Sequence, residues 1–418
     1  MQEDKIKIVW ICHFSNLEVR RYLKFDKWTP MAIVRRIFGK NSVTDYAMWN
    51  TNAIREFEKF DDVELHIIAP HYMISGLQEF EINHIHYHFF ETEDSSLASK
   101  LKSHVFRKLK TSYAKNSKVI CRLVEKIHPD VVHMIGAENP YYGESALSLS
   151  EQIPFIVSLQ TLMADPAFFV NYPILKDQYD YRSELEAAII RRADYIASKA
   201  EHFRKIIHEK VASEATFLDM TLAVGEDVVI VDCEKLYDFV YYAADISKAI
   251  DYALEAFALA KQRYHDITLH VVGGYSESFM QQIKVQMIKL GIESGIDFTG
   301  RLATHDEVIT EIRKARFAIL PLKIDLIACT IREAMANGLP VISTITPVTP
   351  KLNENRDSIL LSEKGDVKVM ADNMCHLLSD EAFAKRIQKN AVETLSEQYS
   401  NAAAMREWKE RYYEVAKK

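Results

Sequence analysis

The sequence predicts an α/β protein with two doubly wound parallel sheets. Apolar runs of strand length alternate with longer helical patterns along most of the chain, which is typical of parallel sheets with helices on both faces. The alternation stops near residues 212–236 and then begins again. A chain of 418 residues is also long enough for two domains of about 150–200 residues each.

The first half contains six candidate strands, with helical patterns between several of them. The strands are IKIVWICHF (6–14), VELHIIAP (63–70), HIHYHFF (84–90), VVHMIG (131–136), FIVSLQ (155–160) and YIAS (195–198). The helical patterns fall at 45–59, 97–127 and 176–193. In sheets of this kind ligands bind beyond the carboxyl ends of the strands, so candidate binding residues are expected there.

The second half repeats the same organisation. Its strands are FVYYAA (239–244), LHVVGG (269–274), IDFTG (296–300), FAILPL (317–322), VIST (341–344) and SILL (358–361), with helical patterns at 247–264, 276–291, 305–315 and 330–337. The predicted domains are 1–225 and 226–399. The final segment, 400–418, is an expected helix with one apolar stripe that can pack on either domain, including back on the first; the stripe consists of Met405, Trp408, Tyr412 and Val415.

Composition excludes several classes of protein. The net charge of −7 argues against a dedicated nucleic-acid binder, which needs a basic surface. No apolar run has the roughly 18 residues of a membrane span. The N-terminus lacks the layout of a signal peptide, and the five cysteines are far apart and odd in number, so neither a disulfide framework nor a zinc site is predicted. We therefore expect a cytoplasmic protein without a metal site.

The stretch TIREAMANGLPVIST (330–344) runs from a short helix into a strand. Thr330 is the expected N-cap, and Glu333 takes the third helical position of a Thr-x-x-Glu capping box. Asn337-Gly338-Leu339-Pro340 ends the helix. The N–H groups near Thr330 and Ile331 then face the carboxyl edge of the sheet, where phosphate binds well. Taken alone, however, this stretch is explained by structural capping.

The run EAMANGLPVI (333–342), with Asp325 eight residues before it, resembles the retaining GT-B glycosyltransferases of family four. Their hallmark is an acid, seven residues, and then Glu-Ala-Met-Ala-x-Gly-Leu-Pro-Val before a strand. The resemblance covers the whole second domain in order and the first domain more loosely. It implies two Rossmann-like domains facing a central cleft, a nucleotide-diphosphate sugar as donor substrate, no further cofactor and no metal.

The resemblance also implies roles for individual residues of the second domain. Glu333 is expected to bind the ribose hydroxyls, since a carboxylate can accept two hydrogen bonds from a vicinal diol. Asp325, where the family usually has glutamate, is expected to contact the donor sugar. With Lys248 it forms the predicted catalytic pair.

A second family motif, Gly-Arg-Leu-x-x-x-Lys-Gly, grips the donor diphosphate and corresponds to the run that begins at Tyr242. Lys248 matches its lysine, whereas Ala243 replaces the arginine and Ala249 replaces the glycine. Negative charge develops on the departing diphosphate, so another cation must compensate, and Arg301 and Arg332 are the candidates. Gly274, at a strand end, either allows close approach of the donor or forms a plain turn.

The first domain is expected to hold the acceptor. Related enzymes often carry a glycine-rich loop after the first strand and a histidine after a later one. Here the loop HFSNLEVRRYL (13–23) has no glycine, and Gln160 takes the place of the histidine. Four polar residues at or beyond strand ends are acceptor-side candidates, each with a structural alternative: Asn16, His133, Glu138 and Gln160. Because Gln160 cannot act as a base, the departing phosphate is expected to take the acceptor's proton, as is usually proposed for the family.

The expected function is a retaining, metal-independent hexosyltransferase of surface polysaccharide or glycolipid biosynthesis. Two basic stretches, 20–40 and 99–118, are either solvated helix faces or contacts with the inner face of the plasma membrane, where a lipid-linked acceptor lies. The alternative is a catalytically degenerate GT-B homologue that serves as a binding or scaffold partner, as Ala243, Asp325 and the glycine-free first loop suggest. A sugar-nucleotide epimerase needs a set of carboxylates that the sequence does not place.

Overall fold

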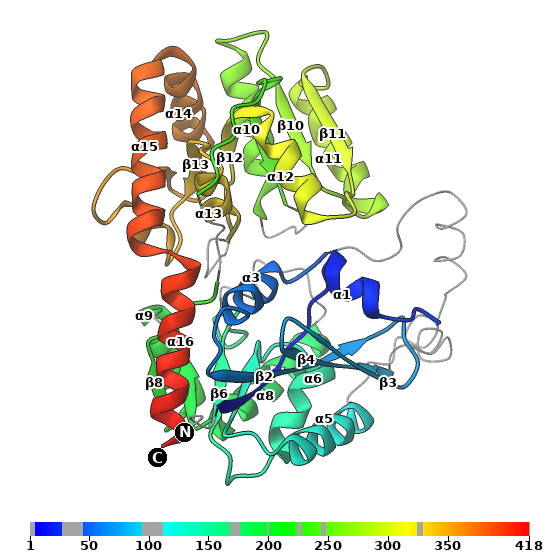
Figure 1. The fold of residues 1–418 in the computed structure, drawn as a ribbon. Coiled ribbons are helices and arrows are strands. Elements are labelled where there is room, and N and C mark those ends of the chain that lie inside the picture. The colour runs from blue at the N-terminus through cyan, green and yellow to red at the C-terminus, as the bar shows by residue number, and fades with distance from the viewer. Residues whose placement is uncertain are drawn as a thin grey trace. The chain divides into compact units, whose positions relative to one another are not determined.

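The computed structural model describes residues 5–26, 45–93, 112–166, 168, 176–198, 200–223, 228–243, 248–323 and 329–417. The chain divides into two compact units (Figure 1). Unit 1 comprises Met1–Ala223 together with Asn401–Lys418, and unit 2 comprises Val224–Ser400. In the part of the chain that is described, no helix is long and apolar enough to cross a membrane.

Unit 1 is built on a sheet with the strand order β3-β4-β2-β1-β5-β6-β7-β8. The strands are β1 (Ile6–Ile11), β2 (Val63–His71), β3 (Leu77–Ile82), β4 (Ile85–Glu91), β5 (Val131–Ile135), β6 (Phe155–Ser158), β7 (Tyr195–Ala197) and β8 (Thr216–Leu218). All neighbours pair in parallel except β3 and β4, which are antiparallel. The strand order reverses beside β1, so a ligand crevice is expected beyond the carboxyl ends of β1 and β5.

The helices of unit 1 connect these strands. They are α1 (Leu17–Tyr22), α3 (Met48–Phe57), α5 (Ala114–Ile127), α6 (Pro140–Gly143), α8 (Lys176–Arg192) and α9 (Glu201–Ile206), with a 3-10 turn, η2 (Glu144–Ser148), and a π-helical turn, η3 (Ile207–Val211). Helix α5 buries Ile120, Leu123, Val124 and Ile127, a spacing of three and four residues that gathers its apolar side chains on one face. It ends at His128, which takes the left-handed conformation of a helix stop.

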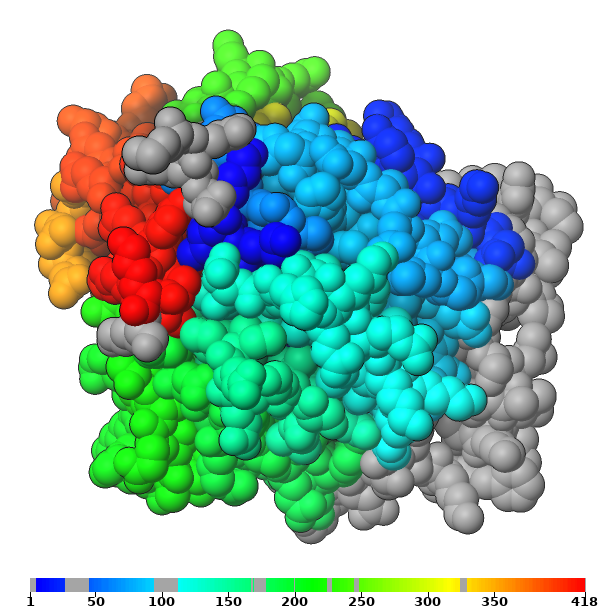
Figure 2. All heavy atoms as spheres, turned by 60° about the horizontal axis from the view of Figure 1, so that its bottom comes forward, coloured from blue at the N-terminus to red at the C-terminus, as the bar shows by residue number. Residues whose placement is uncertain are grey.

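The C-terminal helix α16 (Asn401–Ala416) completes the core of unit 1. Its buried apolar residues are those of the predicted stripe. The indole of Trp10 in β1 donates to the hydroxyl of Tyr412 at 2.9 Å, and the Trp10 and Trp408 rings meet edge to face at 5.6 Å. Figure 2 shows this red segment lying against blue residues from the start of the chain. Of the two domains on which the helix was expected to be able to pack, the structure places it on the first.

Unit 2 has a fully parallel sheet with the order β11-β10-β9-β12-β13-β14. Its strands are β9 (Tyr237–Tyr242), β10 (Leu269–Val272), β11 (Ile296–Gly300), β12 (Ala315–Ile319), β13 (Val341–Thr344) and β14 (Leu360–Ser362). In sequence order this is the 3-2-1-4-5-6 arrangement of dinucleotide-binding folds. The order reverses between β9 and β12, so the loops after these two strands border the expected ligand crevice.

Helices cover both faces of this sheet (Figure 1). They are α10 (Ile250–Lys261), α11 (Glu277–Leu290), α12 (His305–Arg313), α13 (Cys329–Ala336), α14 (Val367–Ser379) and α15 (Glu381–Gln398), with a 3-10 turn, η5 (Thr349–Asn353). Two separate apolar clusters result, one that includes residues of α10, α11 and α14 and one that includes residues of α12, α13 and α15. Side-chain oxygens of Ser276, Thr304, Asp366 and Asp380 cap the N-termini of α11, α12, α14 and α15.

The sequence prediction named neither α14 nor α15, and two strands and one helix start also differ from it. Strand β3 was missed because its residues alternate exposed with half-buried and include Gln78, Glu79 and Glu81, so it contains no apolar run. Strand β8 has three residues, too few for a pattern. Helix α13 already includes Cys329, so Thr330 lies within the helix and is not the predicted N-cap.

Candidate functional site

The loops that follow β9 and β12 meet at the carboxyl edge of the unit 2 sheet. The hydroxyl of Tyr242, the last residue of β9, donates to the backbone carbonyl of Thr330 in the first turn of α13 at 2.5 Å. The ammonium group of Lys323, after β12, lies 2.7 Å from the carboxylate of Asp251 in the first turn of α10. These contacts link the N-terminal end of α13 to the end of β9, and the N-terminal end of α10 to the segment after β12, the two strands between which the strand order reverses.

The predicted donor residues Lys248, Thr330 and Ile331 all lie at this edge. Lys248 stands two residues before α10, and its backbone carbonyl accepts a hydrogen bond of 2.9 Å from the hydroxyl of Tyr241. Thr330 and Ile331 belong to the first turn of α13, whose N–H groups lack partners within the helix. The side chain of Ile331 is fully buried, so only its backbone can contact a ligand.

Ala249 takes the position of the second glycine in the family's diphosphate motif. Its backbone is left-handed, with φ 47° and ψ 49°, and its side chain is fully buried. For a residue with a Cβ atom this conformation costs about 1–2 kcal/mol. Ala249 therefore has a backbone conformation that glycine adopts at no steric cost.

We expect Ala249→Gly to change the free energy of unfolding by less than about 1 kcal/mol, because relief of the left-handed strain offsets the lost methyl burial. The matched control is Ala253→Gly, also fully buried but inside α10. This control should lose about 1–2 kcal/mol through helix propensity and the missing methyl group. Urea unfolding measures both variants, and equal losses would contradict a strained Ala249.

Glu333 contacts a histidine that the sequence analysis did not single out. Its Oε1 atom lies 2.7 Å from Nε2 of His305, the first residue of α12, and each of the two side chains is 16% exposed. The residues Thr304 to Glu307 form a capping box, whose Thr-x-x-Glu pattern is visible in the sequence and was the available signal for His305. A carboxylate has about four lone-pair sites, so Glu333 retains acceptor capacity for a ligand.

The remaining predicted donor residues differ in their surroundings. Arg301 is exposed, directly after β11. A Cβ atom on Gly274 would lie 2.9 Å from the Cα and 2.5 Å from the Cβ of Arg301, so this glycine is required by a neighbouring chain segment. The guanidinium of Arg332 stacks on the ring of Tyr399 at 4.1 Å. Asp325 lies outside the described residues, and its role stays a prediction.

In unit 1, Asn16 follows β1 and serves a local structural role. Its side-chain oxygen caps α1 by accepting from the Val19 amide at 2.9 Å, and its amide nitrogen donates to the hydroxyl of Thr51 at 3.2 Å. Asn16 is 9% exposed. Both ends of its side chain are therefore engaged within the protein.

Glu138 and Gln160 lie together beyond β5 and β6. Rotated so that both ends of its amide are satisfied, Gln160 donates to Oε1 of Glu138 at 3.2 Å and accepts from the indole of Trp49 at 3.0 Å. Arg182 in α8 donates to the backbone carbonyl of Glu138 at 2.7 Å. Oε2 of Glu138 is buried with no hydrogen-bond partner among the described atoms, and burial raises the pKa of this carboxyl group. These residues form a polar cluster at the switch point of unit 1.

His133 was predicted at a strand end, which is wrong. It lies in the middle of β5, fully buried, with its ring nitrogens 2.5 Å from the hydroxyl of Tyr412 and 2.7 Å from that of Ser158. Burial lowers the pKa of His133 to about 3, so the ring is neutral. The run VVHMIG (131–136) did not indicate this, because the position of a residue within a strand cannot be read from an apolar run alone. His133 anchors α16 and is not placed to meet an acceptor.

Sequence reasoning missed several buried or half-buried titratable residues of unit 1, among them His13 and Glu186. His13, after β1, lies among the rings of Tyr46, Tyr141 and Tyr142, and burial lowers its pKa to about 4. Glu186 in α8 is fully buried and accepts from the Met163 amide at 2.7 Å through Oε2, while Oε1 has no partner among the described residues. Its place in a helical pattern gave no sign of burial.

Burial raises the pKa of Glu186 well above its ordinary value, and the charge of Glu138 adds to the shift. A raised carboxyl pKa favours folding below the unfolded value of about 4.5, and this contribution is lost as pH rises toward the folded value. We therefore expect Glu186 to contribute a loss of stability to unit 1 between pH 4.5 and neutrality, opposed by the gain that neutral His13 and His133 contribute as pH rises toward 6.5.

Glu186→Gln should remove this one contribution and be more stable than wild type at neutral pH, since its carbonyl can still accept from the Met163 amide. The exposed Glu184 on the same helix provides the control, and Glu184→Gln should leave the pH dependence unchanged. Urea unfolding across this pH range makes the comparison. Parallel curves for wild type and Glu186→Gln would contradict the assignment.

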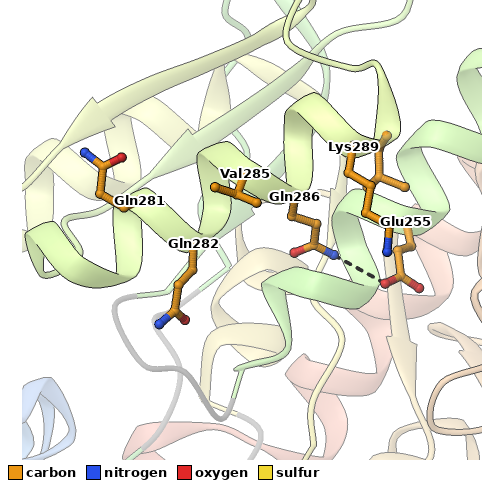
Figure 3. A pocket seen from close by; sticks show the side chains of 7 residues that line it. Glu255, Gln281, Gln282, Val285, Gln286 and Lys289 are labelled. Atoms are coloured by element: carbon orange, nitrogen blue, oxygen red, sulfur yellow. Dashed lines mark hydrogen bonds between the residues drawn. The ribbon is translucent and has the colours of Figure 1, made fainter.

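Other features do not bring the predicted residues together. An open hollow lies along α11 and is lined by Glu255, Gln281, Gln282, Val285, Gln286, Lys289 and Leu290 (Figure 3). None of the predicted donor residues lines it.

Within the described ranges, Glu64, His66 and His86 of unit 1 form a group that could hold a metal ion, although no metal site was predicted. Most of the basic stretches, at 27–40 and 99–111, lies outside the described residues.

Residues 234–394 match the family model described as glycosyl transferases group 1. Unit 2 is a group 1 glycosyltransferase domain. The chain is 28% identical over 132 residues to N-acetyl-alpha-D-glucosaminyl L-malate synthase of Bacillus anthracis. The matched residues make up 31% of this chain and 34% of that protein. The chain spans less than half the length of each of the two curated relatives it matches, 44% of one and 34% of the other.

Solved structures show the fold of the whole chain. Sucrose-phosphate synthase from Thermosynechococcus elongatus superposes with a TM-score of 0.68 at 15% identity, covering 98% of this chain and 99% of that one. HepE from Anabaena, in complex with UDP and glucose, gives a TM-score of 0.66 at 12% identity, covering 98% of this chain and all of that one (100%). The predicted GT-B fold, with its two Rossmann-like units, is confirmed.

Proposed function

We propose that this chain transfers a sugar from a nucleotide-diphosphate sugar to an acceptor, with retention of configuration and without a metal ion in the transfer step. One observation carries the proposal. Lys248, the N-terminal turn of α13 and the carboxylate of Glu333 lie on elements that border the carboxyl edge of the group 1 domain. A cation, a helix N-terminus and a carboxylate are what a diphosphate and a ribose diol need.

Each residue then has a defined task. Lys248 and the N–H groups of Thr330 and Ile331 hold the diphosphate and stabilise the negative charge that develops when the glycosidic bond breaks. Glu333 accepts hydrogen bonds from the ribose hydroxyls while His305 holds its carboxylate in place. Asp325 contacts the sugar, and exposed Arg301 supplies the positive charge that Ala243 lacks.

The donor that we favour is a uridine-diphosphate sugar. HepE, which resembles this chain along its whole length, was solved with UDP and glucose. The Bacillus anthracis relative of the group 1 domain is named for an N-acetylglucosaminyl product. We therefore propose a hexose or an N-acetylhexosamine as the transferred group.

Unit 1 is proposed to receive the acceptor at its switch point, through the cluster around Glu138 and Gln160. A glycan or lipid-linked intermediate of surface polysaccharide assembly fits the resemblance. The neutral Gln160 cannot remove a proton, so the departing phosphate accepts it. Contact of the basic stretches with an anionic membrane surface belongs to the same proposal.

A specific observation also favours the rival function of a nucleotide-binding scaffold. Ala243 directly follows β9, at the position where the family's motif has arginine. Its backbone carbonyl oxygen lies 3.5 Å from the position that a Cβ atom on Gly273 would take. The segment after β9 lies close to β10 and lacks the arginine, so it offers less positive charge to a departing diphosphate. The rival protein would bind the nucleotide and never release the sugar.

The deciding experiment has two readouts. First, thermal shift with the diphosphates of uridine, guanosine and adenosine should show stabilisation by one of them, by about 2.7 kcal/mol at a ligand concentration 100 times the dissociation constant. Second, the matching nucleotide sugars should be hydrolysed or transferred by wild type and not by Glu333→Ala. Binding without sugar release supports the scaffold, and no binding of any diphosphate contradicts both functions.

A further inference from the structure

Strands β2, β3 and β4 carry an unusual set of side chains on one face of the unit 1 sheet. Glu64 and His66 are two residues apart on β2, and His86 stands directly opposite His66 on β4. His88 follows two residues after His86, and Glu79 of β3 stands opposite His88. Because side chains two residues apart point to the same side of a strand, all five lie on one face.

These side chains form a continuous chain of contacts. Oε1 of Glu64 lies 2.9 Å from Nε2 of His66, Nδ1 of His66 lies 3.0 Å from Nε2 of His88, and Nδ1 of His88 lies 2.8 Å from Oε1 of Glu79. The His86 ring stacks on His66 at 4.5 Å between centroids, and its Nδ1 lies 3.5 Å from Glu81. His66 and His88 are less than 10% exposed.

The contacts from Glu64 to Glu79 form three hydrogen bonds, which need three protons. Two neutral imidazoles supply only two, so either one ring carries a second proton or a cation bridges Glu64 and His66. With the cation in place, two protons suffice. Nδ1–H of His66 then donates to His88, and Nδ1–H of His88 donates to Glu79, so that both rings are neutral and both carboxylates are charged.

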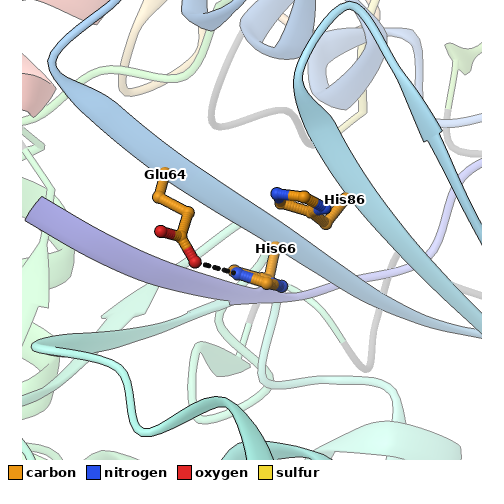
Figure 4. Close-up of side chains that lie close together, drawn as sticks. All are labelled: Glu64, His66 and His86. Carbon is orange, nitrogen blue, oxygen red and sulfur yellow. Dashed lines mark hydrogen bonds and ion pairs between the residues drawn. The ribbon is translucent and has the colours of Figure 1, made fainter. Parts of the chain in front are cut away.

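The geometry points to a binding site for a zinc-type divalent cation at Glu64, His66 and His86. One ligand atom from each of the three lies within 4.8 Å of the other two (Figure 4). Neighbouring ligands of a tetrahedral zinc ion stand about 3.3 Å apart, given bonds of about 2.0–2.1 Å. The pair formed by Glu64 and His66 is already near this spacing. The half-buried His86 stacks on His66, so its ring must rotate to bring a nitrogen to the same ion.

The surroundings match those of metal-binding histidines. Such histidines usually donate their second ring N–H to a carboxylate or another acceptor, which fixes the tautomer. His88 and Glu79 do this for His66, and Glu81 is placed to do it for His86. The ammonium groups of Lys7 and Lys126 lie 3.3 Å from Glu64 and Glu79, so they offset two of the three carboxylate charges and leave one for the cation.

Two imidazoles and one carboxylate leave a fourth position for water or another ligand. A cation here would join β2 to β4 and stabilise the edge of the unit 1 sheet. This cation site lies in unit 1 alone and does not depend on the proposed transfer reaction in unit 2.

Titration of the metal-free full-length chain with Zn²⁺, in competition with a chelating dye, tests the site. We expect one tightly bound ion with a dissociation constant of about 1 μM or lower. His66→Gln and His86→Gln should each raise it at least about 100-fold. His265→Gln, which removes an exposed histidine outside the cluster, should leave it unchanged.

Co²⁺ bound to wild type provides a readout that does not depend on folding of the variants. Its visible spectrum should be that of tetrahedral nitrogen and oxygen ligands, without a thiolate charge-transfer band. Binding that survives both histidine substitutions, a thiolate band, or the absence of tight binding by wild type would each overturn the inference.

Discussion

Glu333→Gln is expected to raise the dissociation constant of the nucleoside diphosphate by about 30–100-fold. The amide keeps one acceptor but loses the negative charge, and a hydrogen bond to a charged group contributes about 1.5–3 kcal/mol. In the wild type, the imidazole of His305 lies 2.7 Å from the carboxylate of Glu333. The amide lacks the negative charge that favours this contact, so the side chain at position 333 is held less firmly. Isothermal titration of both proteins with the preferred diphosphate measures the difference.

Glu311→Gln is the matched control for this variant. Glu311 also contacts a histidine, His270 at 3.1 Å, but it lies toward the end of α12, and His270 pairs with Asp297 near the amino end of β11. The affinity of Glu311→Gln for the nucleoside diphosphate should equal that of wild type. If Glu333→Gln binds the nucleotide as tightly as wild type does, Glu333 does not hold the ribose.

Trp408→Ala is expected to lower the free energy of unfolding of unit 1 by about 3–5 kcal/mol. Trp408 is 1% exposed and packs against the rings of Trp10 and His133 at 5.6 and 4.7 Å. Its removal leaves a cavity between α16 and the sheet, and the buried ring of His133 loses a packing partner. Denaturant unfolding followed by tryptophan fluorescence and circular dichroism measures the loss.

Glu410→Ala, at an exposed position of the same helix, should change stability by less than about 0.5 kcal/mol. Nucleotide binding reports separately on unit 2 and should persist in Trp408→Ala at temperatures where unit 1 has begun to unfold. A loss below about 1 kcal/mol in Trp408→Ala would contradict the assignment of α16 to the core of unit 1.

Periodicity predicted most of the fold because buried parallel strands are apolar throughout and helices between them have a regular stripe. The stripe of α16 correctly named Met405, Trp408, Tyr412 and Val415 as its buried residues. The same reasoning could not choose between the two domains for this helix, because an apolar stripe does not specify its partner. Strand β3 was not predicted, because an edge strand with polar side chains contains no apolar run.

The candidate site was harder to predict than the fold. The motif around Glu333 located the carboxyl edge of unit 2, since motif and strand order agree there. Its partner His305 comes from a different helix, and contacts between elements far apart in sequence leave no local pattern. The same limit concealed the histidine cluster of unit 1, although Glu64-x-His66 and His86-x-His88 each place both side chains on one face of a strand.

Amide hydrogen exchange with and without the preferred nucleoside diphosphate tests the central claim most directly, because it shows where the ligand binds. The account predicts protection at residues 248–256, 301–307 and 329–336, the segments that border the carboxyl edge of the unit 2 sheet. Protection confined to unit 1, or to the hollow along α11, would contradict it.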